Sequence, residues 1–228
     1  MTTYALSVTV AGQPFDMMQY NAAESLTGVF FKSAYDAFNF ENNVLTKITD
    51  ADYPGWSTVT PTSITRSGST ATVTLPSAVN WESGATATVA GAAETEYNGD
   101  FVISVTDSTH FTYTVTGTPA TPATGTITIK CGRTTVPGIV YLDSYFFVMD
   151  TNAVIYNSAL NDPTTWDALD IITAEKEPGA GVALAKSQSY VIALKEWSTE
   201  FFYNNANSPG SPLEPVLSAF TLVGCASG

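Results

Sequence analysis

Apolar runs separated by short polar turns occur twice in the same arrangement between residues 135 and 204. In the first copy an apolar run begins at Gly138, and a second run follows a polar turn and begins at Ala153. In the second copy the corresponding runs begin at Gly181 and Ser198. The copies lie about 45 residues apart, a period typical of β-propeller blades made of several short strands. Because one blade cannot bury both of its faces, we expect further blades or further copies of the chain to cover them.

Aromatic residues align the two copies. Tyr145 corresponds to Tyr190, and residues 155–157 correspond to residues 202–204. The consecutive large side chains from Tyr145 to Phe147 place apolar groups on both faces of a strand. This pattern predicts a blade packed between two other blades, or a subunit packed against its copies, rather than an exposed sheet face.

A third, looser copy of the pattern occupies residues 28–49. Its strand candidates flank a corner at residues 33–36 and a polar turn at residues 41–43. Apolar alternation within residues 4–10 also predicts a strand. A single exception to the all-β pattern is expected within residues 167–177, where a short helical turn can form before Pro178-Gly179 ends it.

Residues 57–133 differ in composition from the rest, since threonine, alanine and glycine dominate and large aromatics are few. Strand candidates follow one another at short, even spacing: 63–66, 71–75, 85–89, 101–106, 110–115 and 125–129. Such spacing, with turn formers between the strands, is typical of an Ig-like β-sandwich. We therefore predict an all-β chain with β-propeller-like blades, built as meander sheets, in residues 1–56 and 134–228. The Ig-like sandwich at 57–133 is expected to be an insertion into a blade loop.

Charge separates the same two regions. The 228 residues carry a formal charge of -13, and the segment 57–133 holds only three basic and five acidic residues. Five basic and sixteen acidic residues remain for the blade region. Such a surface repels nucleic acid, because affinity for phosphates depends on Lys and Arg that displace counterions. A role of this charge in solubility alone is an open alternative.

Candidate catalytic residues are few, and we expect no enzyme, no cofactor and no metal site. His110 is the only histidine, and without a Ser or Cys elbow it indicates a structural role. Five closely spaced carboxylates could supply a facing pair, as in glycosidases, but each is also explained by a turn: Asp143, Asp150, Asp162, Asp167 and Asp170. The segment 150–152 lacks the glycine and the closing glutamate of a calcium loop.

Three aromatic residues are candidates for contact with a glycan or a partner: Trp56, Trp81 and Tyr97. If exposed on loops they can stack on sugars, whereas the alternative is that they belong to the core. Cys131 and Cys225 lie far apart, and we expect each to be a buried thiol rather than part of a disulfide or metal site.

No apolar run reaches eighteen residues, so we expect no membrane-spanning helix. The segment Met1–Leu6 has neither the basic start nor the apolar stretch of a secretory signal, which predicts synthesis in a cytoplasm without a signal peptide.

Several phrases of the sequence resemble the packaged-DNA stabilisation proteins of short-tailed bacteriophages. They are residues 135–149, residues 158–170, residues 196–204 and Gly224-Cys-Ala. The resemblance covers about residues 20–56 and 134–228, and the segment 57–133 resembles Ig-like modules of phage structural proteins. The chain departs from the family by this insertion and by ending before later blades, so we expect it to be a fragment or to be completed by neighbours.

The resemblance implies a tail hub, or nozzle, below the portal and its adaptor. It implies a virion location in the short tail and a homo-oligomeric ring, of six copies by analogy, which forms or closes the DNA channel and stabilises packaged DNA. DNA would pass nearby without tight binding, and the partners would be other copies and neighbouring tail or adaptor proteins. The alternative is a carbohydrate- or host-surface-binding module that uses the Ig-like segment. A propeller enzyme such as a sialidase ranks last, since Arg66 and Arg133 are the only arginines.

Overall fold

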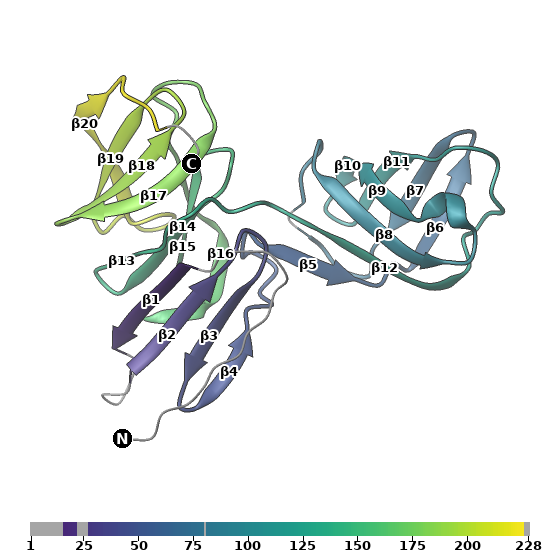
Figure 1. Ribbon diagram of the computed structural model, residues 1–228, viewed down its shortest axis with the longest axis horizontal. Coiled ribbons are helices and arrows are strands. Elements are labelled where there is room, and N and C mark those ends of the chain that lie inside the picture. The colour runs from purple at the N-terminus through teal and green to yellow at the C-terminus, as the bar shows by residue number, and fades with distance from the viewer. Residues whose placement is uncertain (1–15, 22–26, 80, 226–228) are drawn as a thin grey trace.

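The computed structural model describes residues 16–21, 27–79 and 81–225. Figure 1 shows three small sheets grouped together and a separate two-sheet sandwich that projects from them. All pairings between neighbouring strands are antiparallel. The predicted all-β class with propeller-like meander sheets is therefore confirmed, while the described strands form no closed propeller. The strand expected within residues 4–10 lies outside the described residues.

Three sheets follow the meander order in which each strand pairs with the next one along the chain. The first, here the N-terminal sheet, contains β1 (Asp16–Asn21), β2 (Thr27–Lys32), β3 (Ala37–Glu41) and β4 (Val44–Lys47). The second, the middle sheet, contains β13 (Val140–Leu142), β14 (Tyr145–Met149), β15 (Val154–Ala159) and β16 (Asp162–Thr173). The third, the C-terminal sheet, contains β17 (Gly181–Ser187), β18 (Tyr190–Lys195), β19 (Thr199–Asn204) and β20 (Leu213–Thr221).

The sandwich consists of two four-stranded sheets. One has the order β10-β11-β7-β6 and the other the order β5-β12-β8-β9. The bounds are β5 (Trp56–Val59), β6 (Ser63–Ser67), β7 (Thr70–Thr74), β8 (Thr86–Ala92), β9 (Gly99–Val102), β10 (Ser104–Asp107), β11 (His110–Thr114) and β12 (Gly125–Gly132). A single turn of 3-10 helix, η2 (Thr95–Tyr97), precedes β9. Apolar side chains from both sheets form one continuous core.

The middle sheet is buried on both faces, as the run of large residues in β14 predicts. Phe146 and Val148 point into the core shared with the N-terminal sheet. Phe147 and Met149 point the opposite way, into the core shared with the C-terminal sheet. All four side chains are fully buried. Alternation along a strand therefore explains how one blade holds its two neighbours together.

Three details differ from the sequence-based expectations. The helical turn predicted within residues 167–177 is wrong, because β16 runs as a strand to Thr173. The strand predicted at residues 101–106 is two strands, since buried Ile103 marks a crossing from one sandwich sheet to the other. The alignment of residues 155–157 with 202–204 is also out of register.

The register error follows from the strand pairings. Phe147 faces Asn157 in the middle sheet, whereas Ile192, which occupies the place of Phe147, faces Phe201. Asn157 thus corresponds to Phe201 and not to Asn204. Because a shift by an odd number of residues exchanges the two faces of a strand, sequence similarity alone placed these side chains on the wrong side.

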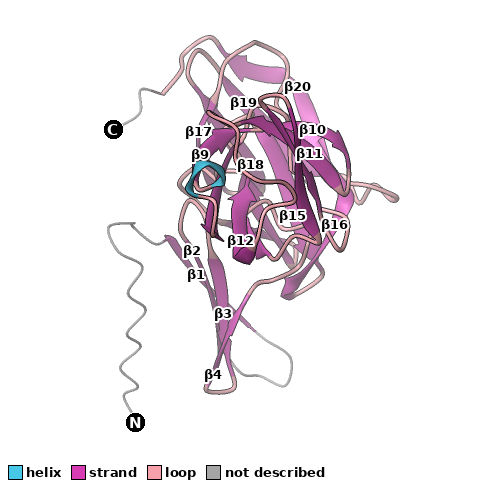
Figure 2. Ribbon diagram, turned by 90° about the vertical axis from the view of Figure 1, so that its right-hand side faces the viewer, coloured by secondary structure: helices cyan, strands magenta, loops and turns pink. Residues whose placement is uncertain are grey.

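The two ends of the sandwich segment lie side by side in the structure. Trp56, at the start of β5, pairs with Gly132, at the end of β12. A Cβ on Gly132 would lie 2.2 Å from the carbonyl oxygen of Gly55, so the two crossing segments touch backbone to backbone. Figure 2, turned by 90°, shows the β3–β4 hairpin extending in another direction, away from the sandwich sheets.

Candidate assembly surface and joint

The C-terminal sheet presents an apolar face that no described core covers. Val191 and Ala193 point into the core shared with the middle sheet, so Ile192 between them points away from it. Ile192 pairs with Ala185 on one side and with Phe201 on the other. These three side chains form a row across β17, β18 and β19, and each is only half-buried. We call this row the outer face of the C-terminal sheet.

Large apolar side chains are also exposed near this face. They belong to the turn before β19, to β20 and to the segment after it: Trp197, Leu217, Phe220, Leu222 and Val223. The last segment runs back beside that turn, because the Thr199 hydroxyl donates to the Val223 carbonyl at 2.9 Å. Exposed large apolar side chains gathered on one sheet and its flanking segments make this region a candidate interaction surface.

Buried ion pairs fix the blades to one another. Lys195 of β18 is 1% exposed, and its ammonium donates to Glu200 at 3.2 Å. The same ammonium donates to the carbonyl oxygen of Ala174 at 2.6 Å and to that of Glu177. Because both carbonyls follow β16, this lysine ties the C-terminal sheet to the middle sheet.

Lys32 of β2 performs the same task for the N-terminal sheet. Its ammonium lies 3.1 Å from the Asp16 carboxylate and donates to the Val136 carbonyl at 2.6 Å. Burial lowers the pKa of Lys32, and the charge of Asp16 opposes that shift. The Asp16 carboxylate also accepts from the Gly138 amide at 2.9 Å, so both ions hold the segment that leads into β13.

Arg133 lies at the joint between the sandwich and the blades. One of its nitrogens is 2.6 Å from Glu82 of the sandwich, and another is 3.3 Å from Asp150 of the middle sheet. The Tyr156 hydroxyl donates to Asp150 at 2.9 Å and accepts from Arg133. Asn152 donates to Glu82 at 3.0 Å, which adds a second bond across the joint. The two crossing strands are thus supplemented by a charged network that orients the sandwich.

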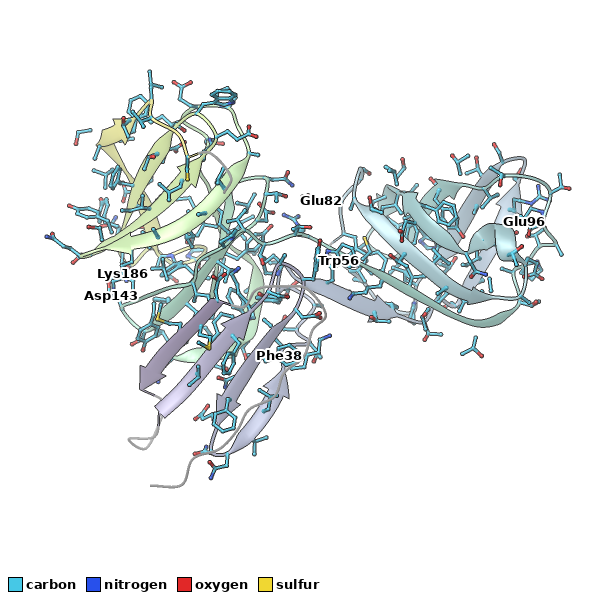
Figure 3. All side chains as sticks on the ribbon, viewed as in Figure 1. Phe38, Trp56, Glu82, Glu96, Asp143 and Lys186 are labelled. Carbon is cyan, nitrogen blue, oxygen red and sulfur yellow. The ribbon has the colours of Figure 1, made fainter. Side chains whose placement is uncertain are left out.

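The three predicted contact aromatics are not equally accessible. Tyr97 is fully buried and Trp81 is 7% exposed, so both correspond to the alternative in which they belong to the core. They fill the sandwich core, where Trp81 packs 5.6 Å from Phe111. Trp56 is half-buried at the joint, where Figure 3 shows it beside Glu82. It lines a cavity of about 380 Å³ together with Trp81.

The remaining candidate residues have structural surroundings. His110 is half-exposed on the β10–β11 hairpin, 2.9 Å from Asp107. A hydrogen bond from the Thr109 amide and a second from His110 lower the pKa of Asp107 to about 2. Neither cysteine forms a disulfide; Cys131 is buried as expected, whereas Cys225 is only half-buried.

The five carboxylates do not converge on one site. Asp150 is fully buried, and its carboxylate also accepts hydrogen bonds from the main-chain amides of Asn152 and Val154. These hydrogen bonds occupy the oxygen that a calcium loop would use as a ligand. Two of them, Asp167 and Asp170, line a common cavity. In the described part of the chain no group of three or more His, Cys, Asp or Glu side chains is placed to hold a metal. The described part also contains no helix long and apolar enough to cross a membrane.

The comparison with protein families supplies the identification. The sequence model of the family described as bacteriophage P22 Gp10, β-propeller, matches residues 71–228. The chain belongs to this Gp10 family. The family consists of phage structural proteins, and its propeller architecture agrees with the three meander sheets. The match begins at β7 and therefore includes most of the sandwich.

Comparisons with solved structures give only distant likeness. Phage phi92 endosialidase is 15% identical with a TM-score of 0.28, over 81% of this chain and 36% of that one. BBS1N in complex with ARL6DN is 11% identical with a TM-score of 0.28, over 94% of this chain and 59% of that one. The chain thus spans less than two thirds of either protein, and at this TM-score neither comparison supports an argument. No curated protein matches significantly.

Sequence reasoning missed the charged residues that connect the three sheets and the sandwich to one another. Lys32, Lys195 and Arg133 stand in apolar or mixed surroundings without a motif. One signal was available: with only eight basic residues in the chain, a lysine inside an apolar strand end, such as Lys195, needs a buried acceptor.

Proposed function

We propose that this member of the Gp10 family is a subunit of a phage tail hub, or nozzle, that forms or closes the DNA channel below the portal. The proposal rests on the uncovered apolar outer face of the C-terminal sheet. In a propeller family, another blade is expected to cover such a face. In the middle sheet the position equivalent to Ile192, Phe147, is fully buried by the next blade. Burial of Ile192 and Phe201 by a neighbour would complete the same packing.

The proposed neighbours are further copies of the chain, in a ring of six by analogy with the family, together with other tail or adaptor proteins. Ring formation would supply the missing cover, because apolar faces of this kind are stable when another sheet removes them from water. Such an assembly places the protein in the short tail of the virion.

The acidic blade region fits a channel through which DNA moves. Sixteen acidic residues against five basic ones repel phosphates, and all the buried lysines are already paired. We expect the purified protein to bind duplex DNA negligibly at physiological salt. A fluorescence anisotropy titration measures this, and tight binding would contradict the proposed channel wall.

We infer that residues 57–133 are an Ig-like domain inserted into the blade region. Support comes from the continuous core of this segment and from the pairing of Trp56 with Gly132, which brings its two ends together. An insertion of this kind can project from a ring without disturbing the contacts between blades.

A second candidate function is carbohydrate or host-surface binding by the sandwich. The cavity of about 380 Å³ lined by Trp56 and Trp81 favours it, since aromatic walls with hydroxyl groups such as those of Ser57 and Thr58 suit a sugar. A titration of the full chain with host glycans, followed by tryptophan fluorescence, tests it. Loss of the response in Trp56→Ala would support a role at this cavity, and no response to any glycan would reject it.

Ring formation is tested with a charge placed in the outer face. We expect the wild type to run well above the 24.1 kDa of one chain in size-exclusion chromatography with light scattering. Ile192→Asp should lower the mass to that of one chain, because it buries a charge in the contact. The control is Val102→Asp, at a 67% exposed position on the sandwich, which should leave the mass unchanged. A wild type of 24 kDa at every concentration would reject self-assembly.

A further inference from the structure

A cavity of about 280 Å³ lies between β16 and the loop that follows β19. Its lining comes from Asp167, Asp170 and Asn157 on one side and from residues 207–212 on the other. Tyr145 completes the wall. Neither the proposed ring contact nor the joint uses these residues.

A bulge in β16 brings the two carboxylates to this place. Tyr156 pairs with Ile171 and Ser158 pairs with Trp166, so Asn157 alone faces the four residues 167–170. The extra residues are displaced from the regular pairing of the strands. Asp167 and Asp170, both in the bulge, are therefore presented to one cavity, although three residues apart on a regular strand would point to opposite faces.

These carboxylates have no cationic side chain beside them. Every basic residue of the chain is described, and each is engaged elsewhere. The partners are Asp16 for Lys32, Asp36 for Lys47, main-chain carbonyls for Arg66, the Trp56 ring for Lys130, Glu82 and Asp150 for Arg133, the Leu217 carbonyl for Lys176, the Tyr141 carbonyl for Lys186 and Glu200 for Lys195. Two carboxylates thus line one cavity without a counter-charge from the protein.

Asn157 adds an independent observation. The residue is 1% exposed, and its amide nitrogen donates to the Ser158 carbonyl at 3.2 Å and to Asp170 at 3.3 Å. Its amide oxygen is buried and accepts no hydrogen bond within the described part of the chain. A buried oxygen of this kind costs free energy unless a donor or a cation reaches it. The nitrogen end therefore holds Asp170 in place, and the oxygen end is available to a ligand.

We propose that Asp167, Asp170 and the Asn157 amide oxygen bind a Ca²⁺ ion in this cavity. All the donors are hard oxygens, which suits Ca²⁺ or Mg²⁺, and the absence of His and Cys among the lining residues disfavours zinc. The irregular bulge and the room for several waters favour Ca²⁺, because Mg²⁺ demands a near-ideal octahedron. With two carboxylates we expect a dissociation constant on the order of 10⁻⁴ to 10⁻³ M, as in extracellular calcium modules. The ion would pin the loop at 207–212 to β16.

Terbium luminescence tests the site on the full chain. Tb³⁺ replaces Ca²⁺ on oxygen ligands, and an excited tyrosine close to it transfers energy to the ion. We expect excitation at the tyrosine band to give terbium emission that Ca²⁺ suppresses at submillimolar to millimolar concentration. Tyr145→Phe should lower the emission and leave the Ca²⁺ dependence of the melting temperature unchanged. Emission that Ca²⁺ does not suppress, or that Tyr145→Phe leaves intact, would overturn the proposal.

Two substitutions and a matched control complete the experiment. Asp170→Asn and Asp167→Asn should each weaken Ca²⁺ binding by about 10-fold or more. Because each also relieves repulsion, both should melt no lower than the wild type in the presence of a chelator. Asp100→Asn removes the same charge from the sandwich surface and should bind Ca²⁺ as the wild type does. Equal binding by the wild type and by both cavity variants would show that the ion binds elsewhere, and the proposal would fail.

Discussion

The sandwich and the blade region solve the problem of a stable core in different ways. The sandwich core is apolar, with Trp81, Phe111 and Tyr113 packed among aliphatic side chains from both sheets. Every buried polar or charged side chain among the described residues lies outside 57–133. The blades bury Lys32 and the Lys195–Glu200 ion pair, and they leave an apolar face uncovered.

This difference indicates which of the two regions needs contacts with neighbouring sheets to be stable. An apolar core is non-directional and closes on itself once enough surface is buried. A buried ion pair adds little net stability, yet removal of one partner is costly, so it specifies one arrangement of two sheets. We interpret the sandwich as a self-sufficient unit and the blades as parts whose mutual positions are fixed for assembly.

The largest expected effect concerns the ability of the sandwich to fold without the blades. The isolated segment 56–133 should fold by itself, because its core and the Trp56–Gly132 pairing lie within it. Urea unfolding followed by circular dichroism should show one cooperative transition, and the same transition should appear as one of two in the full chain. If the isolated segment has no cooperative transition, the contrast between the two regions is wrong.

The next effect concerns the ion pairs between blades. Lys195→Met should lower the free energy of unfolding of the blade region by about 3–5 kcal/mol, since Glu200 is left buried without a counter-charge. Lys186→Met, at an exposed lysine that donates to the Tyr141 carbonyl, is the control and should stay within about 0.5 kcal/mol. Both values come from urea titrations of the blade transition. Equal effects of the two substitutions would show that burial of Lys195 does not matter.

The sequence predicted the architecture better than the contacts, and the reason is physical. Alternation and turn residues are local, so the strands of the sandwich and the doubly buried β14 were foreseeable from their own segments. Lys32 contacts residues more than a hundred positions away, and no local pattern encodes such a partner. The bulge in β16 was missed for a related reason, since the four residues opposite Asn157 look helical until a neighbouring strand pairs on both sides of them. Trp81 and Tyr97 looked like loop aromatics because burial is decided by how the two sheets close.

A pair of tyrosines sharpens the comparison at a smaller scale. In the sandwich the Tyr113 hydroxyl donates to the Tyr97 carbonyl at 3.3 Å, so Tyr113→Phe should cost about 1 kcal/mol of unfolding free energy. In the blades the Tyr156 hydroxyl serves both Asp150 and Arg133, and Tyr156→Phe should cost about 1.5–3 kcal/mol because its partners are charged. The urea transition of the sandwich measures the first change in unfolding free energy, and that of the blade region measures the second. A reversed order would mean that the charged network at the joint contributes less than a single neutral hydrogen bond.

The smallest expected effect concerns the rate at which a buried thiol reacts, rather than the free energy of unfolding. Burial raises the pKa of the Cys131 thiol to about 11 and leaves it no access to water in the sandwich. In a Cys225→Ser background, iodoacetamide at pH 8 should therefore label Cys131 much more slowly than an ordinary thiol. The pKa change alone removes about 100-fold of the thiolate. Urea that unfolds the sandwich should restore ordinary reactivity, whereas urea that unfolds only the blades should not. Labelling that follows the blade transition would show that the sandwich does not stay closed without the blades, which removes the basis for treating it as self-sufficient.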